Sequence, residues 1–589
     1  MLHRKSVWTL LSLTLALSLA LSACAPGATP TAEPQATTPP EATQAPGSTE
    51  APPEPTEAAP EPTEAPAMEF SGTATITFVQ EPDNLNPWYT SMWFSSITTQ
   101  FWLKGLWSFD DSNNPVPELA AELPTAANGG LSADGKTVTV KLRDDVTWSD
   151  GAPLTADDFV FTYNMIMSDG NVVQTRYPYE DYVAGVEAAD EHTVVITFSE
   201  PFAPWLTSIF TYVLPQHILQ PVFDADGTLD NAEWNRAPTV GIGPFVFSEW
   251  ESGSHIIFTA NPNWINPPHL EQIVIRIVPD DAAQDAAILA GDSDIGVFLS
   301  SDKIETLEAD GTVDVVAVGS GYNEGWFLNV SPETARPFML DPNVRRALAL
   351  ATDRFSFVND RLDPDINPVN VTFWDTTPPF GNPDLEPYPY DPEEAARLLD
   401  EAGWVDSNGD GTRDKDGEEL VVRYITNERE LRKDMQAVVQ QGWTELGIGS
   451  ELVNYSADIY WNAFNADGPQ AQGNYDIAQY SSVPAFPDPD ASASWLCSEV
   501  ASADNPDGGN WQGYCDPAMD ALMKEQAVTL DFDARIELFK QIEQKIYDET
   551  LYVGIWKDPD LWSINNRLTD VRLSGATPFW NAHEWTIGT

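Results

Sequence analysis

Hydrophobic and polar residues alternate along short stretches of this chain and recur at helical spacing in others. Over residues 137–143, Val138, Val140 and Leu142 alternate with polar residues, which is the two-residue period of a half-buried strand. A similar alternation resumes at Phe245, after a corner rich in glycine and proline. Both segments are predicted to be strands.

Helical patterns lie between such strands. Thr155, with Asp158 three residues later, indicates a helix start, and Pro392 and Gly403 bracket another helix. A helix near 342–354 turns small apolar residues inward and is expected to keep its charged residues outside, namely Arg345, Arg346, Asp353 and Arg354. The alternation of helices and strands predicts an α/β architecture, with a second sheet beyond about residue 320.

The stretch "GLSADGKT", Gly130 to Thr137, fits the phosphate-loop pattern GxxxxGK[ST]. A phosphate loop needs a strand before it and a helix after it, so that backbone N–H groups can wrap the phosphates. Here a strand pattern follows and no apolar run precedes. The stretch is therefore predicted to be a hairpin turn rather than a nucleotide site.

The N-terminus has the features of an export signal. Basic residues precede an apolar run over 7–21, and "LSAC" ends at Cys24, which resembles the bacterial lipobox. We expect residues 1–23 to be a signal peptide and Cys24 to become a lipid anchor; the alternative is an ordinary signal peptide with a chance cysteine. Residues 24–69 are rich in Pro, Glu, Thr and Ala and are expected to be a disordered tether.

Composition narrows the class of partner. The chain has 589 residues, with 91 acidic and 29 basic side chains and a net charge of −62. Nucleic acids and anionic lipids need a basic face, so neither is an expected partner, and the lipid would be the only membrane contact. Outside the cytoplasm, the remaining cysteines, Cys497 and Cys515, are expected to form a disulfide; two free thiols are the alternative.

The segment "LRDDVTWSDGAPLTADDFVFTYN", from Leu142, resembles the signature of the family 5 extracytoplasmic solute-binding proteins of ABC importers. Other matching segments follow the family's order from about Thr75 to the C-terminus. They include "EPDNLNPWYTS" from Glu81, "PTVGIGPFVFSEW" from Pro238, "DPNVRRALALATDR" from Asp341 and "YDPEEAARLLDEAGW" from Tyr390.

The resemblance implies a two-lobed, periplasmic-binding-protein-like α/β fold of type II, in its large family 5 variant, with a ligand cleft between the lobes. The implied parts are lobe I at 70–320, with a family-specific subdomain at about 106–235, lobe II at 321–560, and a return to lobe I at 561–589. Two crossings would fall near Gly319–Gly321 and Lys557–Leu561. Closure of the cleft would be the signal that a membrane permease reads, with the protein acting as a monomer outside the cytoplasm.

Enzyme chemistry finds little support in the chain. The six histidines are scattered without an HExxH pair, and no GxSxG motif occurs, so no catalytic residue is predicted and a secreted hydrolase is only the alternative. Asp406, Asn408, Asp410 and Asp414 occupy positions one, three, five and nine of a calcium-loop pattern, but the twelfth position is Gly417. A solvated hairpin loop is favoured there, with a structural calcium ion as the alternative and no other cofactor expected.

The resemblance implies three classes of ligand. Peptide is the commonest solute of the family, and Asp488 is our candidate for its ammonium group, although the position at which dipeptide binders carry an aspartate is Ala485 here. Some relatives stack sugar rings on tryptophan, so an oligosaccharide is the alternative, and a nickel complex stays open. The predicted cleft walls are Trp88, Trp93, Trp326, Trp374, Tyr480 and Phe486.

Overall fold

The computed structural model describes residues 70–588 except 463, 483–485, 491 and 507. The chain divides into two compact units, Met1–Ala67 and Met68–Thr589, and the description below concerns the second. Every hydrophobic core cluster found among the described residues lies within this second unit. The unit Met68–Thr589 therefore contains the apolar packing that it needs to fold.

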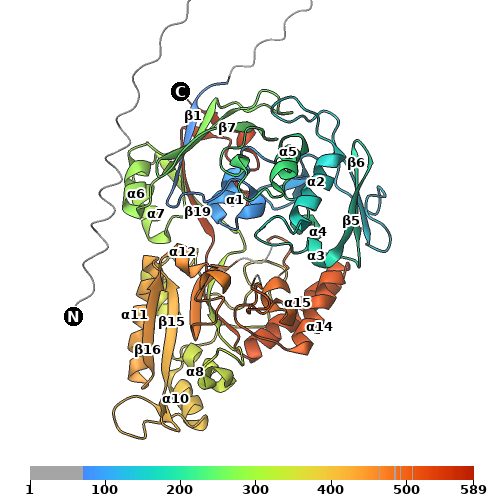
Figure 1. Ribbon diagram of the computed structural model, residues 1–589. Coiled ribbons are helices and arrows are strands. Elements are labelled where there is room, and N and C mark those ends of the chain that lie inside the picture. The colour runs from blue at the N-terminus through green and yellow to red at the C-terminus, as the bar shows by residue number, and fades with distance from the viewer. Residues whose placement is uncertain (1–69, 463, 483–485, 491, 507, 589) are drawn as a thin grey trace, which may run out of the picture. The chain divides into compact units, whose positions relative to one another are not determined.

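A seven-stranded sheet occupies the upper part of Figure 1. Its strands, in spatial order, are β11 (Val313–Val318), β19 (Asp560–Asn565), β10 (Ile295–Val297), β1 (Thr73–Phe78), β9 (Gln272–Ile277), β8 (His255–Ala260) and β7 (Phe245–Glu251). β1 pairs in parallel with both β9 and β10, whereas β19 pairs antiparallel with β10 and β11. The C-terminal part of the chain thus returns to the sheet that the N-terminal part begins.

A five-stranded sheet lies below it in Figure 1. Its order is β16 (Gly449–Tyr455), β15 (Val421–Asn427), β17 (Ile477–Ser482), β12 (Asn323–Leu328) and β18 (Tyr552–Lys557). α11 (Glu430–Glu445) connects the parallel strands β15 and β16 and packs on both. This is a β–α–β unit, so the predicted second sheet beyond residue 320 and the α/β architecture are confirmed.

Smaller elements surround the two large sheets. A three-stranded sheet joins β4 (Thr137–Lys141), β6 (Thr193–Phe198) and β5 (Val183–Asp190), and three two-stranded sheets join β2 (Trp107–Phe109) to β3 (Pro115–Pro117), β13 (Asp414–Lys415) to β14 (Glu418–Glu419), and β20 (Leu568–Thr569) to β21 (Thr586–Ile587). The remaining helices are α1 (Trp93–Thr99), α2 (Ala156–Met167), α3 (Tyr179–Tyr182), α4 (Trp205–Ser208), α5 (Gln216–Asp226), α6 (Asp281–Leu289), α7 (Ile304–Leu307), α8 (Pro342–Leu350), α9 (Arg354–Arg361), α10 (Pro392–Glu401), α12 (Ala457–Tyr460), α13 (Ser492–Trp495), α14 (Pro517–Val528) and α15 (Phe532–Asp548).

Local sequence signals explain several of these elements. The Thr155 N–H donates to the Asp158 carboxylate (3.0 Å), so the predicted capping box does begin α2. α10 begins at Pro392, and Gly403, with φ of 85°, follows its end. The phosphate-loop-like stretch is a turn followed by the strand β4, and Leu131 bridges to Val138 across it. The hairpin prediction is therefore confirmed.

The prediction that the charged residues of 342–354 stay outside was wrong for two of them. Arg345 is 4% exposed and Arg354 is fully buried. The Arg345 guanidinium donates to the carbonyl oxygens of Met339 (2.7 Å) and Thr550 (3.0 Å), and that of Arg354 donates to carbonyls of two other segments. A guanidinium can be buried in this way because its fixed fork of N–H groups satisfies carbonyl oxygens that would otherwise lack donors.

Candidate functional site

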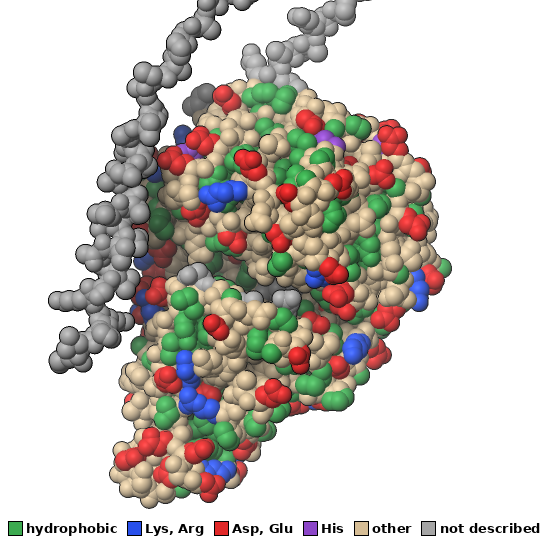
Figure 2. All heavy atoms as spheres, in the orientation of Figure 1, with side chains coloured by type: hydrophobic (Ala, Val, Ile, Leu, Met, Phe, Trp, Pro, Cys, Tyr) green, Lys and Arg blue, Asp and Glu red, His purple; other side chains and the backbone are tan. Residues whose placement is uncertain are grey.

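The chain passes twice between the seven-stranded and five-stranded sheets. One passage, at 319–322, links β11 to β12, and the other, Asp558–Pro559, links β18 to β19. Both passages coincide with the predicted crossings. The surface is hollowed between the part that carries the seven-stranded sheet and the part that carries the five-stranded sheet (Figure 2). The boundary between the sheets is therefore the candidate site for a solute.

A buried network of charged side chains lies beside the second passage. The Glu324 carboxylate, on β12, is fully buried and accepts two hydrogen bonds of 2.8 Å from the Arg432 guanidinium. The Ser481 hydroxyl lies 2.7 Å from a carboxylate oxygen of both Glu324 and Asp558. Burial would raise the pKa of Asp558, but Arg429 and the Ser481 hydroxyl outweigh it and hold that pKa below its ordinary value. The Asp558 carboxylate is thus held ionised at the boundary.

Arg429 connects this network to the other sheet. Its guanidinium lies 3.3 Å from the Asp558 carboxylate and 4.8 Å from the centroid of the Phe298 ring, which follows β10. Phe298 has a φ of 61°, a left-handed conformation that is unusual for a bulky residue, and its side chain is 39% exposed. Such a conformation persists only where its surroundings enforce it. Packing against Trp93, with 6.2 Å between ring centroids, helps to hold it.

The predicted wall residue Trp93 lies at this boundary. It is half-buried at the start of α1, between the rings of Phe298 and Trp562, the latter at 5.7 Å. Trp88 is also half-buried, but its ring meets the edge of Tyr179 (5.8 Å), next to the three-stranded sheet. The structure therefore brings Trp93, rather than Trp88, to the crossings.

Tyr480 presents an aromatic face on the side of the five-stranded sheet. It is half-buried on β17 and stacks on Phe327 with 4.0 Å between centroids. Trp461, 43% exposed, meets it edge-on at 5.3 Å. Trp461 was not among the predicted wall residues, because it follows a helix of only four residues that shows no clear periodicity.

Two predicted wall residues are wrong. Trp326 and Trp374 are both fully buried, so neither can contact a solute in this conformation. The indole N–H of Trp326 donates to the Tyr424 hydroxyl (2.9 Å) in the core beneath the five-stranded sheet. Trp374 packs edge-on against Phe539 (5.1 Å) in a neighbouring core. Both residues stabilise the fold by burying apolar area.

The loop after β17 carries the candidate ammonium partner. Asp488 forms an ion pair with the buried guanidinium of Arg535, and Thr207 donates to its carbonyl oxygen (3.3 Å). A ligand ammonium would therefore have to share this carboxylate with Arg535. Asp490 accepts a hydrogen bond from the hydroxyl of Tyr177, which precedes α3. The loop thus connects the part that carries α14 and α15 to the subdomain built around α2–α5.

The structure has two hollows that differ in size and position. One, of about 210 Å³, lies between α1, β2 and Phe486, so Phe486 is the predicted wall residue that lines a cavity. A wider one, of about 470 Å³, lies at the edge of the three-stranded sheet and is lined by charged residues of both signs. The wider hollow is remote from both crossings, whereas the smaller one has walls from both sides of the boundary.

The calcium-like loop has mostly internal hydrogen bonds. The Asp406 carboxylate accepts hydrogen bonds from the backbone N–H groups of Gly409 (2.6 Å) and Gly411 (3.1 Å). The carboxylate of Asp414, the first residue of the β13–β14 hairpin, accepts from the Ser407 N–H (2.9 Å). Among the described residues, the group of three side chains that could hold a metal ion lies elsewhere, on the β7–β8 hairpin. The potential ligand atoms of Glu249, Glu251 and His255 all lie within 4.8 Å of one another. The hairpin prediction is supported, and calcium at this loop stays a prediction.

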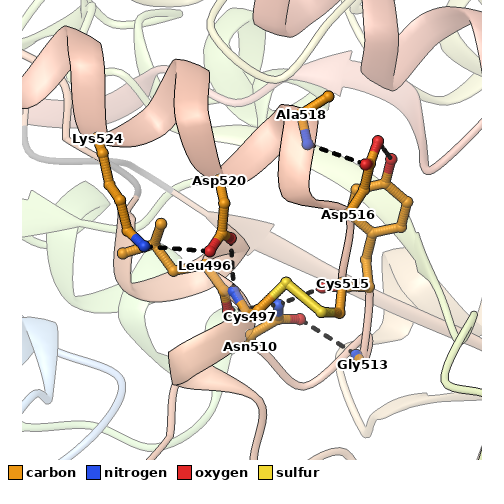
Figure 3. The surroundings of a disulfide bond; sticks show 10 residues. Leu496, Cys497, Asn510, Gly513, Cys515, Asp516, Ala518, Asp520 and Lys524 are labelled. Carbon is orange, nitrogen blue, oxygen red and sulfur yellow. Dashed lines mark hydrogen bonds and ion pairs between the residues drawn. A yellow bond between two sulfur atoms is a disulfide. The ribbon is translucent and has the colours of Figure 1, made fainter.

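Cys497 and Cys515, which were expected to pair, form a disulfide in the structure (Figure 3). Neighbouring hydrogen bonds hold both ends of the bridged loop. The Asp520 carboxylate accepts from the Cys497 N–H (2.8 Å), and the Asn510 side chain accepts from the Gly513 N–H (3.1 Å). The bridge joins the short helical turn Cys497–Glu499 to the residues that lead into α14.

Comparison with known proteins places the chain in a family. Residues 114–504 match the family described as Bacterial extracellular solute-binding proteins, family 5 Middle, and the chain belongs to this family. It is 27% identical over 532 residues to the oligopeptide-binding protein AppA of Bacillus subtilis. The aligned region covers 88% of this chain and 92% of AppA. This family consists of solute-binding proteins, so the chain is a binding protein and not an enzyme.

Solved structures agree. The structure of Bacillus subtilis AppA in complex with a nonapeptide has a TM-score of 0.75 at 25% identity, covering 88% of this chain and all of that one. NikZ of Campylobacter jejuni in complex with Ni(L-His) has a TM-score of 0.76 at 23% identity, with coverage of 87% and 99%, and shows the shared fold. The predicted periplasmic-binding-protein-like fold is confirmed. Among the residues that the structure describes, no helix has the length and apolarity to cross a membrane.

Proposed function

We propose that this chain is the extracytoplasmic receptor of an ABC importer, which encloses an oligopeptide or a similar solute between its two large sheets and releases it unaltered to a membrane permease. The observation that carries this proposal is the double passage of the chain at 319–322 and Asp558–Pro559. Two short connections allow the sheets to move as bodies about a hinge. A solute that contacts both sheets favours the closed arrangement in proportion to the extra contacts it makes there.

The groups at the boundary suit a peptide. Arg429 donates one hydrogen bond to Asp558 among the described residues, so its other N–H groups can meet a carboxylate of the solute. Trp93, Tyr480 and Trp461 offer apolar faces for side chains. The nonapeptide in the AppA complex and the name of that relative support the same class of solute.

The N-terminal features complete the proposal. Cys24 would carry a lipid that holds the protein at the outer face of the cell membrane, and residues 25–69 would act as a tether. These residues lie outside those that the structure describes. The protein would act as a monomer whose macromolecular partner is the permease.

A thermal-shift screen of the unit Met68–Thr589 tests the proposal. The ligands are di- to hexapeptides, gluco- and xylo-oligosaccharides, and chelated nickel, each at concentrations up to 1 mM. A solute at 100 times its dissociation constant stabilises the folded protein by about 2.7 kcal/mol, which is readily measured. Stabilisation by peptides supports the proposal. Stabilisation by sugars alone would replace the peptide with an oligosaccharide, and stabilisation by chelated nickel alone would replace it with a nickel complex.

A further inference from the structure

The cavity of about 210 Å³ beside Phe486 has an unusual electrostatic character for this chain. Its lining includes Ser96, Gln100, Lys104, Ser108, Thr211 and Phe486. Among the residues that the structure describes, Lys104 is the only charged one in this lining, although acidic residues outnumber basic ones by 91 to 29 in the whole sequence. The surroundings of Lys104 therefore decide what the cavity can receive.

Lys104 is nine-tenths buried and poorly satisfied. It is 5% exposed, and its ammonium lies 3.7 Å from the carboxylate of Glu118, which is beyond hydrogen-bond distance. The same Glu118 oxygen accepts a hydrogen bond of 2.8 Å from Ser108. The Lys104 ammonium forms no hydrogen bond with any described side chain or carbonyl, although it carries three donors. The ammonium is therefore able to donate charge-assisted hydrogen bonds to an acceptor group of a bound molecule.

A second buried polar side chain lies on the same wall. Gln100 is also 5% exposed, and its side-chain oxygen accepts the Phe579 N–H (2.9 Å). Its amide N–H₂ group donates to none of the described residues. Ser96 and Thr211 are exposed and line the same cavity. The cavity therefore has an ammonium and an amide donor at buried positions and hydroxyl groups at exposed ones.

We infer that this cavity is a subsite that receives a carboxylate group of the solute, so that the protein prefers peptides with an acidic side chain. The inference rests on the proposed function and names the chemistry of one part of that site. Whole-ligand sites typically have about 300–1,000 Å³, so a cavity of about 210 Å³ suits one group of a larger solute. Phe486, which follows β17, supplies the wall from the other side of the boundary.

The overall charge makes such a subsite selective. A chain with a net charge of −62 repels acidic solutes over most of its surface, so an acidic peptide needs a specific cation at its site. The negative charge of Glu118 partly balances the positive charge of Lys104, so the cavity is close to neutral without a solute. The Ser108 hydroxyl donates a hydrogen bond that holds Glu118 in place. A carboxylate in the cavity would then gain charge-assisted hydrogen bonds from Lys104 and a neutral one from Gln100.

Calorimetric titration of matched peptides tests the inference. The probes are tri- and tetra-alanine peptides with a single Glu, Gln or Lys at each position in turn. We expect the Glu peptide to bind about tenfold more tightly than its Gln counterpart at one position, because a charge-assisted hydrogen bond is gained. The preference should be lost in Lys104→Met, should be retained in part in Lys104→Arg, and should persist in Lys136→Met, which removes a half-buried lysine of the same lobe outside the cavity lining.

A further variant separates binding from folding. Lys104→Met leaves Glu118 without its cation, so the double variant Lys104→Met/Glu118→Gln removes both charges while the net charge stays constant. If this folded double variant also loses the Glu preference, the inference stands. If the wild-type protein binds Glu and Gln peptides equally, or if the preference survives in the double variant, the inference is wrong while peptide binding remains. If no peptide binds at all, the proposed function fails and the inference fails with it.

Discussion

The guanidinium of Arg429 lies 4.8 Å from the centroid of the Phe298 ring, although the two residues belong to different sheets. Arg429 lies between β15, a strand of the five-stranded sheet, and α11. Phe298 directly follows β10, a strand of the seven-stranded sheet. The contact joins the parts of the molecule that carry the two sheets, beside the crossing at Asp558. It is therefore part of what holds the site in the arrangement that the structure shows.

Phe298→Ala removes this contact and is expected to weaken solute binding. A partly exposed cation–π contact contributes about 0.5–1 kcal/mol, so the dissociation constant should rise about two- to fivefold. Calorimetric titration with the solute found by the screen measures the change. Phe532→Ala, at an exposed aromatic residue at the start of α15, is the control. Equal effects of the two substitutions would show that the Arg429–Phe298 contact plays no part in closure.

Glu324→Gln should destabilise the fold more than a surface substitution does. The change leaves the buried Arg432 guanidinium without its carboxylate partner, at a cost of about 3–5 kcal/mol in the free energy of unfolding. Urea denaturation measures this cost. The double variant Glu324→Gln/Arg432→Met removes both charges and should recover part of the loss; a double variant that is less stable than the sum of the two single changes would contradict this account.

Replacement of Cys497 and Cys515 by alanine should lower stability. The bridge closes a loop with a sequence separation of 18, which contributes about 3 kcal/mol in the chain-entropy view. Unfolding of the double alanine variant, compared with the native protein with and without reductant, measures this contribution. Solute affinity should stay within about twofold, because the disulfide lies beside α14 and takes no part in the contacts across the boundary that are described above. A stability unchanged by both reduction and substitution would oppose the prediction.

Asp560 should make stability depend on pH. One of its carboxylate oxygens is buried without a hydrogen-bond partner among the described residues, and burial raises the pKa of the group to about 8. In the unfolded chain this carboxyl ionises near pH 4, so the folded state binds one more proton between about pH 4 and 8 and loses relative stability as the pH rises through that window.

The variant Asp560→Asn isolates this contribution. It should unfold with a free energy higher than that of the wild type at pH 8, by about 3–5 kcal/mol, and the difference should shrink toward zero as the pH falls to 4. Denaturant titrations at pH 4, 6 and 8 give the three values. A difference that is constant with pH would mean that Asp560 does not titrate in this window.

Local patterns predicted the elements well, because the interactions that begin and end them are local. The bond between Thr155 and Asp158, the Pro392 start and the strand at 137–141 all depend on residues a few positions apart. The buried guanidinium of Arg354 could not be foreseen, since its carbonyl partner at Gly554 lies 200 residues away. Sequence periodicity indicates which side of a helix is polar but not what distant segment covers it.

The site was predicted less completely for the same reason. Abundant tryptophans suggested cleft walls, yet a single sequence does not show whether an aromatic ring faces a core or a solute, and Trp326 and Trp374 face cores. Lys104 was missed, although a signal existed: it is the one charged residue in the apolar stretch "FWLKGLW". A lysine within an apolar run of this kind is expected to lie in the protein interior together with its charged group. Because charged side chains are rarely buried, such a lysine is a reason to look for a function.

The central claim is that the protein captures an intact solute between its two sheets and does no chemistry on it. Native mass spectrometry of the unit Met68–Thr589, incubated with an equimolar pool of defined di- to nonapeptides, tests this claim most directly. We predict a one-to-one complex whose bound peptide leaves the protein with its full mass, and with enrichment of the peptides that contain glutamate. Recovery of shortened peptides, or a spectrum that shows only free protein at every peptide concentration, would contradict it.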